Sequence, residues 1–149
     1  MTNNDTLRRL RYAFNISDTD VAETIALTGR PTAADEVTNW LKREDESGHS
    51  ALSDIDLCRF LDGLIIKNRG PRPSGEAPEP QEFLSNNEIL KKLRIALELK
   101  EEGVLAVFKK AGFNVTKAEL GSFFRKKGHR NYRKVPEQVL RKFIHGLSV

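Results

Sequence analysis

The chain has 149 residues and a formal net charge of +4; 38% of its residues are hydrophobic and 31% are charged. This length and composition predict a soluble, helix-rich protein of one ordinary domain or two very small ones. Because no apolar run approaches membrane-spanning length and no secretory signal is visible at the start, we expect a cytoplasmic protein without a membrane partner.

Two helices are predicted before the glycine at position 29. The first starts at an asparagine or serine cap and has one apolar face that includes a single arginine: Leu7, Leu10, Arg11 and Phe14. The second begins near Ser17 and Asp18 and ends before Gly29, because glycine favours the left-handed conformation that stops a helix.

Two further helices follow. The third begins at Thr32, and the fourth begins near Ser53. Their inward-facing residues are Val37, Trp40 and Leu41 in the third helix and Leu57, Phe60, Leu61 and Leu64 in the fourth. The only cysteine, Cys58, lies in the apolar pattern of the fourth helix, so an internal disulfide is excluded and we expect a buried thiol.

A proline- and glycine-rich linker is predicted at residues 68–84. Its first part, NRGPRPSGEAPEP at 68–80, holds four of the six prolines and two glycines. Extended like polyproline, this part would span roughly 40 Å at about 3.1 Å per residue. Such a linker allows the flanking units, 1–67 and 85–149, either to dock or to move separately.

The second unit repeats the first. At an offset of 83 residues the two match without a gap from Asn3/Asn86 to Leu64/Leu147. The shared positions are mostly apolar and helically spaced, so the copies share a core. In the second copy, residues 116–119 (TKAE) form a capping box and Pro136 falls in the first turn of the last helix. The predicted fold is all-α, with two tandem four-helix modules joined by the linker.

Two arginines lie on apolar faces, at Arg11 and at its repeat equivalent Arg94. A charge beside a core is costly unless it is paired. Glu36 and Glu119 recur at the same offset beside the apolar face of the third helix. We therefore predict structural ion pairs Arg11–Glu36 and Arg94–Glu119; the alternative is that the arginines bind a ligand.

Several short patterns resemble the YehS-like bacterial proteins, a family of small proteins with a twice-repeated domain of unknown function. They are the tandem N-N-[DE]-x-L-[RK]-[RK]-L-R-x-A opening, the G-x-x-[PN] turn, the W-L-K end of the third helix and the F-[LI]-x-G-L end of the fourth. The resemblance covers nearly the whole chain outside the linker. It implies an all-helical tandem repeat in a bacterial cytoplasm, and it implies no activity and no catalytic residues.

The copies differ most in charge. Residues 1–69 carry nine Lys and Arg against twelve Asp and Glu, whereas residues 85–149 carry fifteen against six. An imbalance of this size between related halves points to a polyanionic partner, or to attraction between the halves.

The contrast is sharpest after the third helix of each copy. Residues 124–134, FRKKGHRNYRK, hold six cations, whereas residues 41–51, LKREDESGHSA, hold an acidic cluster. Arginine can clamp phosphate, lysine adds charge and tyrosine can stack on a base, so we expect RNA or DNA binding; a solvated loop without a partner is the alternative. The candidate binding residues are Lys117, Ser122, Arg125, Lys126, Lys127, Arg130, Asn131, Tyr132, Arg133 and Lys134.

A sharper version is a helix-turn-helix with residues 116–127 as the recognition helix. Lys117, Ser122 and Lys126 would then face the groove. The connector between the second and third helices of copy two, AGFNVT, is longer than in a usual helix-turn-helix. Phe123 and Phe124 are expected to pack in the core, which leaves less of the helix surface for DNA. Non-specific contact is therefore favoured over sequence-specific reading of DNA.

The rival hypothesis is a protein-interaction module. The acidic loop of copy one (Glu44, Asp45 and Glu46) complements the basic loop of copy two, within one chain or head-to-tail between chains. Trp40 would serve as an exposed anchor in that case, although we expect it in the core.

The sequence predicts no enzyme, no metal site and no cofactor. Its three histidines and one cysteine lack metal-ligand spacing. No glycine-rich phosphate loop, nucleophile elbow or H-E-x-x-H motif is present.

Overall fold

The computed structural model describes residues 1–149 and contains eight α-helices and no strand, as the all-α prediction requires. The helices are α1 (Asn3–Phe14), α2 (Asp18–Ala26), α3 (Ala34–Leu41), α4 (Asp54–Arg69), α5 (Asn86–Ala96), α6 (Glu101–Lys110), α7 (Lys117–Phe123) and α8 (Glu137–Ser148). None of them combines the length and the apolar character that a membrane crossing needs.

Four of the eight helix starts follow the predicted capping chemistry, whereas α1 is capped by Thr2 and not by the predicted asparagine or serine. Ser17, Ser53 and Ser85 each accept a hydrogen bond from a backbone N–H in the first turn of the helix that follows. Thr116 and Glu119 form the predicted capping box of α7. Gly29 ends the second helical segment with φ +90°, where a side chain would be strained.

Three predicted helix boundaries are wrong. The third helix begins at Ala34 and not at Thr32, because the Thr32 hydroxyl bonds Arg30 instead of capping the helix. Pro136 is the N-cap of α8, with extended backbone, and does not lie in its first turn. Helix α4 runs to Arg69 and so takes two residues from the predicted linker; its last turn is held by Asn68, which donates to the Ala96 carbonyl at 2.9 Å.

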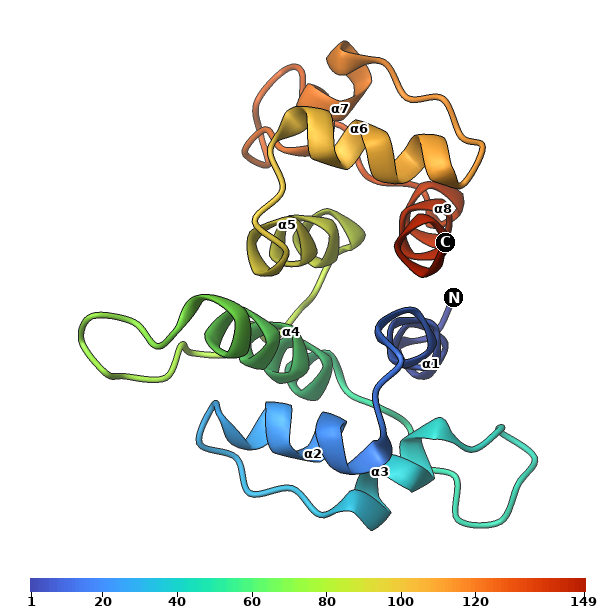
Figure 1. Cartoon of the computed structure of the whole chain (residues 1–149), viewed down its shortest axis with the longest axis vertical. Helices are drawn as coiled ribbons and strands as arrows, with labels where there is room; N and C mark the ends of the chain where they lie inside the picture. Colours follow the sequence, from blue (N-terminus) through green and yellow to red (C-terminus); the bar gives the residue numbers. More distant parts are fainter.

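The eight helices form a stack about a pseudo-two-fold axis (Figure 1). Helices α2 and α3 lie on one side and α6 and α7 on the other, with α1, α4, α5 and α8 between them. In the middle, α4 packs on α5 and α1 packs on α8. Exchanging the two copies turns one contact into the other, so the modules dock through two equivalent seams.

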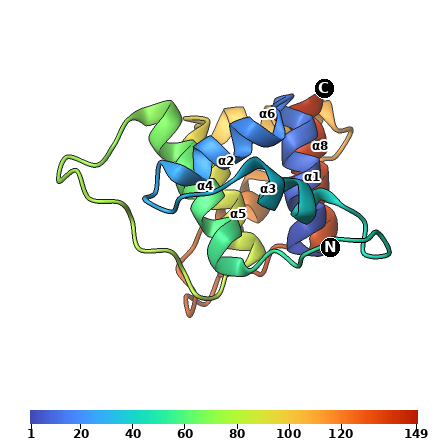
Figure 2. The same ribbon diagram turned by 90° about the horizontal axis from the view of Figure 1, so that it is seen from below.

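Helices α4 and α5 run parallel, which explains the linker. The start of α4 is tied to the start of α5 by Asp54, which accepts from the Leu84 N–H at 3.0 Å. The chain must therefore return along the whole of α4, about 24 Å at 1.5 Å per residue. The linker leaves the body in a wide loop and comes back beside α4 (Figure 2). Parallel neighbours require such a crossover, whereas antiparallel ones need only a short turn.

One continuous core of 26 buried residues joins the two copies. Its largest fully buried side chains include Phe60, Phe108 and Phe143. Trp40 is only 3% exposed, so it lies in this core, as expected, and does not offer an exposed anchor. Cys58 is fully buried, and burial raises the pKa of its thiol.

The predicted ion pair between Arg11 and Glu36 does not form. The Arg11 guanidinium bonds Asp18 at 3.0 Å, at the start of α2. Glu36 is taken by Arg30, at 2.7 Å, and Arg30 also contacts Asp56 at 3.0 Å. Arg30 lies in the loop just before α3, only six residues from Glu36, and its guanidinium therefore occupies the Glu36 carboxylate in place of Arg11.

The second predicted pair, between Arg94 and Glu119, is also absent. Arg94 donates to the Leu99 carbonyl at 3.0 Å, and its guanidinium lies 4.6 Å from the centre of the Phe124 ring. The Glu119 carboxylate accepts from Thr116 in the capping box. The two glutamates therefore recur at one helical position for different reasons.

Candidate nucleic-acid interface

The basic loop, residues 124–134, is held at both ends by one buried side chain. The amide nitrogen of Asn87, in the first turn of α5, donates to the Phe123 carbonyl at 3.1 Å and to the Arg133 carbonyl at 2.7 Å. Its oxygen accepts from the Val135 N–H at 2.8 Å. A loop rich in like charges thus has a fixed base, although its cations repel one another.

The first copy has the same anchor. Asn4 donates to the carbonyls of Trp40 (2.8 Å) and Ser50 (2.9 Å), and accepts from the Leu52 N–H at 3.1 Å. These partners are the repeat equivalents of those of Asn87. Sequence reasoning missed this role, although its signal was the recurrence of the Asn-Asn pair among shared positions that are mostly apolar.

The cations of the basic loop make no ion pair and donate no side-chain hydrogen bond within the protein. No carboxylate lies within 4.0 Å of any of their charged nitrogens, although nine ion pairs occur elsewhere. All six are exposed: Arg125, Lys126, Lys127, Arg130, Arg133 and Lys134. The loop therefore presents a concentrated positive charge with no internal counter-charge.

The other predicted binding residues are placed differently. Lys117 and Asn131 are exposed, and Tyr132 is half-buried. Ser122 is buried and donates its hydroxyl to the Glu119 carbonyl. The prediction is therefore corrected for Ser122, whose hydroxyl proton is used within its own helix and is not offered to a ligand.

Two open hollows flank the loop. The first, of about 620 Å³, is lined by cations from the loop together with Lys91, Phe124 and Tyr132. The second, of about 610 Å³, is lined by Lys117, Arg130 and Arg133. Arg125 and Tyr132 line both hollows, so they join into one surface.

A further aromatic side chain lines the first hollow and was missed by sequence reasoning. Phe83 is 79% exposed and belongs to the predicted linker, outside both repeats. Because the preceding residues are mostly charged or proline, nothing in the sequence indicated that Phe83 belongs to a binding surface. The backbone N–H of the next residue, Leu84, is fixed by Asp54, so Phe83 is held where the linker meets α5.

The helix-turn-helix alternative does not fit the structure. Helix α7 spans only Lys117–Phe123, and the buried Asn87 amide donates to the carbonyl of its last residue. Lys126 therefore lies in the loop, not on the helix face that carries Lys117. The surface at this end of the molecule is an irregular loop beside a short helix, which is not a recognition helix.

The acidic loop of the first copy, residues 41–51, lies far from the basic loop. In Figure 1 the two loops are at opposite corners, and they are also apart in Figure 2. No carboxylate of Glu44, Asp45 or Glu46 pairs with a cation. The pairing of the two loops within one chain is therefore ruled out in this arrangement.

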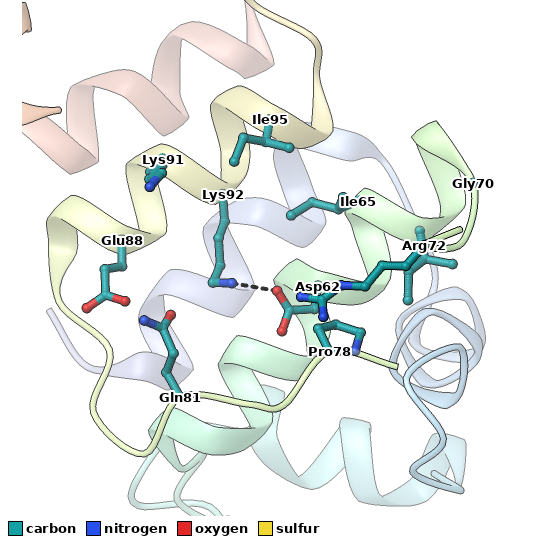
Figure 3. A pocket seen from close by; sticks show the side chains of 11 residues that line it. Asp62, Ile65, Gly70, Arg72, Pro78, Gln81, Glu88, Lys91, Lys92 and Ile95 are labelled. Carbon is teal, nitrogen blue, oxygen red and sulfur yellow. Dashed lines mark hydrogen bonds and ion pairs between the residues drawn. The ribbon is translucent and has the colours of Figure 1, made fainter. Parts of the chain in front are cut away.

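A separate cavity of about 390 Å³ lies at the α4–α5 seam, under the linker (Figure 3). Asp62, 3% exposed, bonds the Lys92 ammonium at 2.6 Å across the seam. The Cys58 thiol donates weakly to the other Asp62 oxygen at 3.5 Å, and its pKa is raised by burial. The Asp62 and Lys92 charges thus neutralise each other in an ion pair. The Cys58 thiol, whose pKa is raised, is not activated as a nucleophile.

No cluster of three or more His, Cys, Asp or Glu side chains is arranged to hold a metal ion.

Comparison with known proteins gives a family. The model of the family described as "Protein of unknown function (DUF1456)" matches residues 3–70 and again residues 86–149. "Uncharacterized protein YehS" of Escherichia coli (strain K12) is 38% identical over 148 residues, which cover 99% of this chain and 95% of that protein. No solved structure matches the chain.

Proposed function

We propose that this chain, which belongs to the family described as Protein of unknown function (DUF1456), binds nucleic acid without strong sequence preference through its second repeat. The observation that supports this proposal is the set of six exposed loop cations with no carboxylate partner. Nucleic acid is an abundant polyanion of the cytoplasm, where we place the protein.

The first repeat provides the contrast that makes this charge informative. Of the arginines in residues 1–69, Arg8, Arg11, Arg30, Arg59 and Arg69 each contact a carboxylate of the same chain. A cation that is already paired with a carboxylate contributes little binding free energy toward a phosphate. An unpaired cation that neutralises a phosphate releases the counterions condensed on the nucleic acid, and this release favours binding. The second repeat therefore carries the binding energy in our proposal.

Binding should be electrostatic, so a salt titration tests it. With about four phosphates contacted, the log–log slope of affinity against salt should be about −3 for a single strand or −4 for a duplex. Fluorescence anisotropy of a labelled oligonucleotide measures both affinity and slope. An absence of binding at low salt, or an affinity that does not change with salt, would remove the proposal.

A matched pair of charge reversals locates the binding surface. Lys126→Glu with Lys127→Glu changes two exposed lysines of the loop, whereas Lys109→Glu with Lys110→Glu changes two exposed lysines at the other end of the second repeat. Both variants alter the net charge equally. We expect the loop variant to lose at least tenfold in affinity and the control to stay within threefold; equal losses would indicate attraction to net charge alone.

A second candidate function is head-to-tail self-association. The charged side chains of the acidic and basic loops form no ion pair within the chain. The two loops lie at opposite corners of the molecule, a geometry that suits contacts between successive chains (Figure 1). Sedimentation analysis at low and high salt tests it. A mass that rises at low salt and is restored to monomer by reversing residues 44–46 to lysine would favour this function over nucleic-acid binding.

A further inference from the structure

We infer that the second repeat prefers single-stranded nucleic acid, with one base stacked on Phe83 in the first hollow while the loop cations hold the phosphates. The inference rests on the proposed function and names its ligand class. It adds a residue from the linker to a surface that otherwise belongs to the repeat.

The first hollow combines the two kinds of group that a nucleotide needs. Five cations line it, against the carboxylates of Asp54 and Glu88. Both carboxylates already accept hydrogen bonds, Asp54 from Leu84 and Asn3 and Glu88 from Ser85. Four aromatic side chains line the same hollow: Phe83, Phe123, Phe124 and Tyr132. Charge and aromatic surface are thus within one concave site.

Among these aromatic rings, Phe83 is the one open to a ligand. It is 79% exposed, whereas Phe123 is buried and Tyr132 is half-buried. Phe124 is also half-buried, and its ring is covered by Arg94 at 4.6 Å. An exposed phenylalanine beside cations has a large apolar face in water and no protein partner for it. Stacking a base on that face removes apolar area from water and is sequence-tolerant, because every base has a π-face.

A duplex cannot use this aromatic face. In double-stranded nucleic acid the bases are stacked on each other and present only their edges in the grooves. An unpaired strand can turn a base outward and keep its phosphates on the loop. The second hollow continues the track, because it shares Arg125 and Tyr132 with the first and has four cations against the single carboxylate of Glu119.

The decisive experiment compares variants of Phe83 on a labelled oligothymidylate of about 15 nucleotides, within the range of site sizes of small single-strand binders. Phe83→Ala should weaken binding about 5- to 150-fold, the equivalent of roughly 1–3 kcal/mol per stacked base. Its salt slope should stay unchanged, because no phosphate contact is lost. Phe83→Trp should restore affinity, and its indole fluorescence should be quenched on binding.

Two controls separate stacking from other causes. Tyr12→Ala removes an aromatic side chain of the first repeat that is equally open, at 76% exposed, and that lies beside Arg8 and Arg9; it should leave affinity within twofold. A duplex of the same length should bind the wild type more weakly than the single strand, and Phe83→Ala should not change the duplex affinity.

The failures of the two proposals are distinguishable. If oligothymidylate binds with a steep salt slope but Phe83→Ala binds like the wild type, or the duplex binds as tightly, the stacking inference is overturned and nucleic-acid binding stands. If neither strand nor duplex binds at low salt, both proposals fall. Because Phe83 is exposed, Phe83→Ala should keep the wild-type thermal midpoint, and an unfolded variant would itself contradict the placement described.

Discussion

At the scale of single residues, two buried asparagines determine where the charged loops lie. Asn4 and Asn87 each use both amide hydrogens and the amide oxygen on backbone groups at the two ends of a loop. A buried polar group is tolerated only when it is satisfied in this way. The loop sequence between the anchor points is therefore free to vary, which is how one scaffold carries an acidic loop in one copy and a basic loop in the other.

Replacing Asn87 should affect both stability and binding. Asn87→Ala leaves two carbonyls and one N–H without their partner, and we expect a loss of about 2–4 kcal/mol in the free energy of unfolding. Affinity for nucleic acid should also fall, because the loop base is no longer fixed. Asn4→Ala is the control: an equal loss of stability in urea denaturation, with affinity unchanged. If Asn87→Ala alters neither quantity, the anchoring role is wrong.

The Arg30–Glu36 contact predicts a dependence of stability on pH. The hydrogen bond from Arg30 lowers the pKa of Glu36 below its ordinary value of 4.5. A lowered folded-state pKa stabilises the protein above the unfolded-state pKa, and this stabilisation disappears as the pH falls through the folded-state value. Because Glu36 is 40% exposed, we expect only about 0.5–1 kcal/mol.

Urea denaturation of Glu36→Gln and wild type tests this dependence. The two proteins should differ by that amount at neutral pH and converge at acid pH, below the usual range of glutamate pKa values. A difference that is the same at both pH values would indicate that charge is not its cause.

At the scale of helices, two glycines set how closely the outer and inner helices pack. A Cβ atom on Gly63 of α4 would lie 2.1 Å from the Thr24 carbonyl oxygen of α2. A Cβ on Gly146 of α8 would lie equally close to the Val107 carbonyl oxygen of α6. In both cases the added Cβ would meet a backbone carbonyl oxygen, at equivalent positions of the two copies. No change of side-chain rotamer relieves such a clash; only a movement of the helices can.

Alanine at either glycine should therefore destabilise the fold. We expect Gly63→Ala and Gly146→Ala each to cost about 2–3 kcal/mol or more, in the upper range for overpacked cores. Gly121→Ala in α7 is the matched control, because nothing lies within 4 Å of the added Cβ. It should stabilise the protein by about 0.5–1 kcal/mol, as in any exposed helix interior. Thermal melts followed by circular dichroism compare the three; destabilisation by the control alone would reverse the argument.

At the scale of the whole molecule, the chain is an internal dimer. The α4–α5 and α1–α8 seams are equivalent under exchange of the copies, and one core runs through both. The seams differ in chemistry. The first contains the Asp62–Lys92 pair at 2.6 Å, whereas His145 and Arg9 occupy the equivalent positions in the second. The amino terminus pairs with Glu137 at the start of α8 and closes that side.

Docking through a shared core predicts one cooperative unfolding transition. Lys92→Met leaves the Asp62 carboxylate buried and unpaired, and we expect a loss of about 3–5 kcal/mol. Adding Asp62→Asn should recover part of it. Lys91→Met, at an exposed neighbouring position, should stay within about 0.5 kcal/mol. Calorimetry that resolves two separate transitions in the wild type would contradict the shared core.

Sequence reasoning reached the repeated architecture because helical spacing, glycine stops and serine or threonine caps are local signals. The helices, the Thr116 capping box and the buried Trp40 follow from them. The predicted ion pairs were wrong because the repeat spacing gives only the positions of the charged residues along the chain. It does not show which side chain lies nearest to each carboxylate in the fold. The repeat equivalent of Arg30 is Phe113. Comparison of the two copies therefore did not indicate that Arg30 pairs with Glu36.

The docking and the binding surface depend on distant parts of the chain. The helices that form the seams have ordinary amphipathic patterns in the sequence. No local feature of the sequence distinguishes a face that packs on the other copy from a face that packs within its own copy. The charge of the basic loop is visible in its sequence, but its freedom from carboxylates is a property of the fold. Phe83 joins that surface only because parallel packing of α4 and α5 returns the linker to the start of α5.

One measurement tests the central claim most directly: nuclear magnetic resonance of the ¹⁵N-labelled full chain during titration with oligothymidylate at low salt. The account predicts that amide shifts change at residue 83 and across residues 124–134, that residues 41–51 stay unchanged, and that the changes vanish as salt is raised. Changes centred on residues 41–51, or none at all, would contradict it.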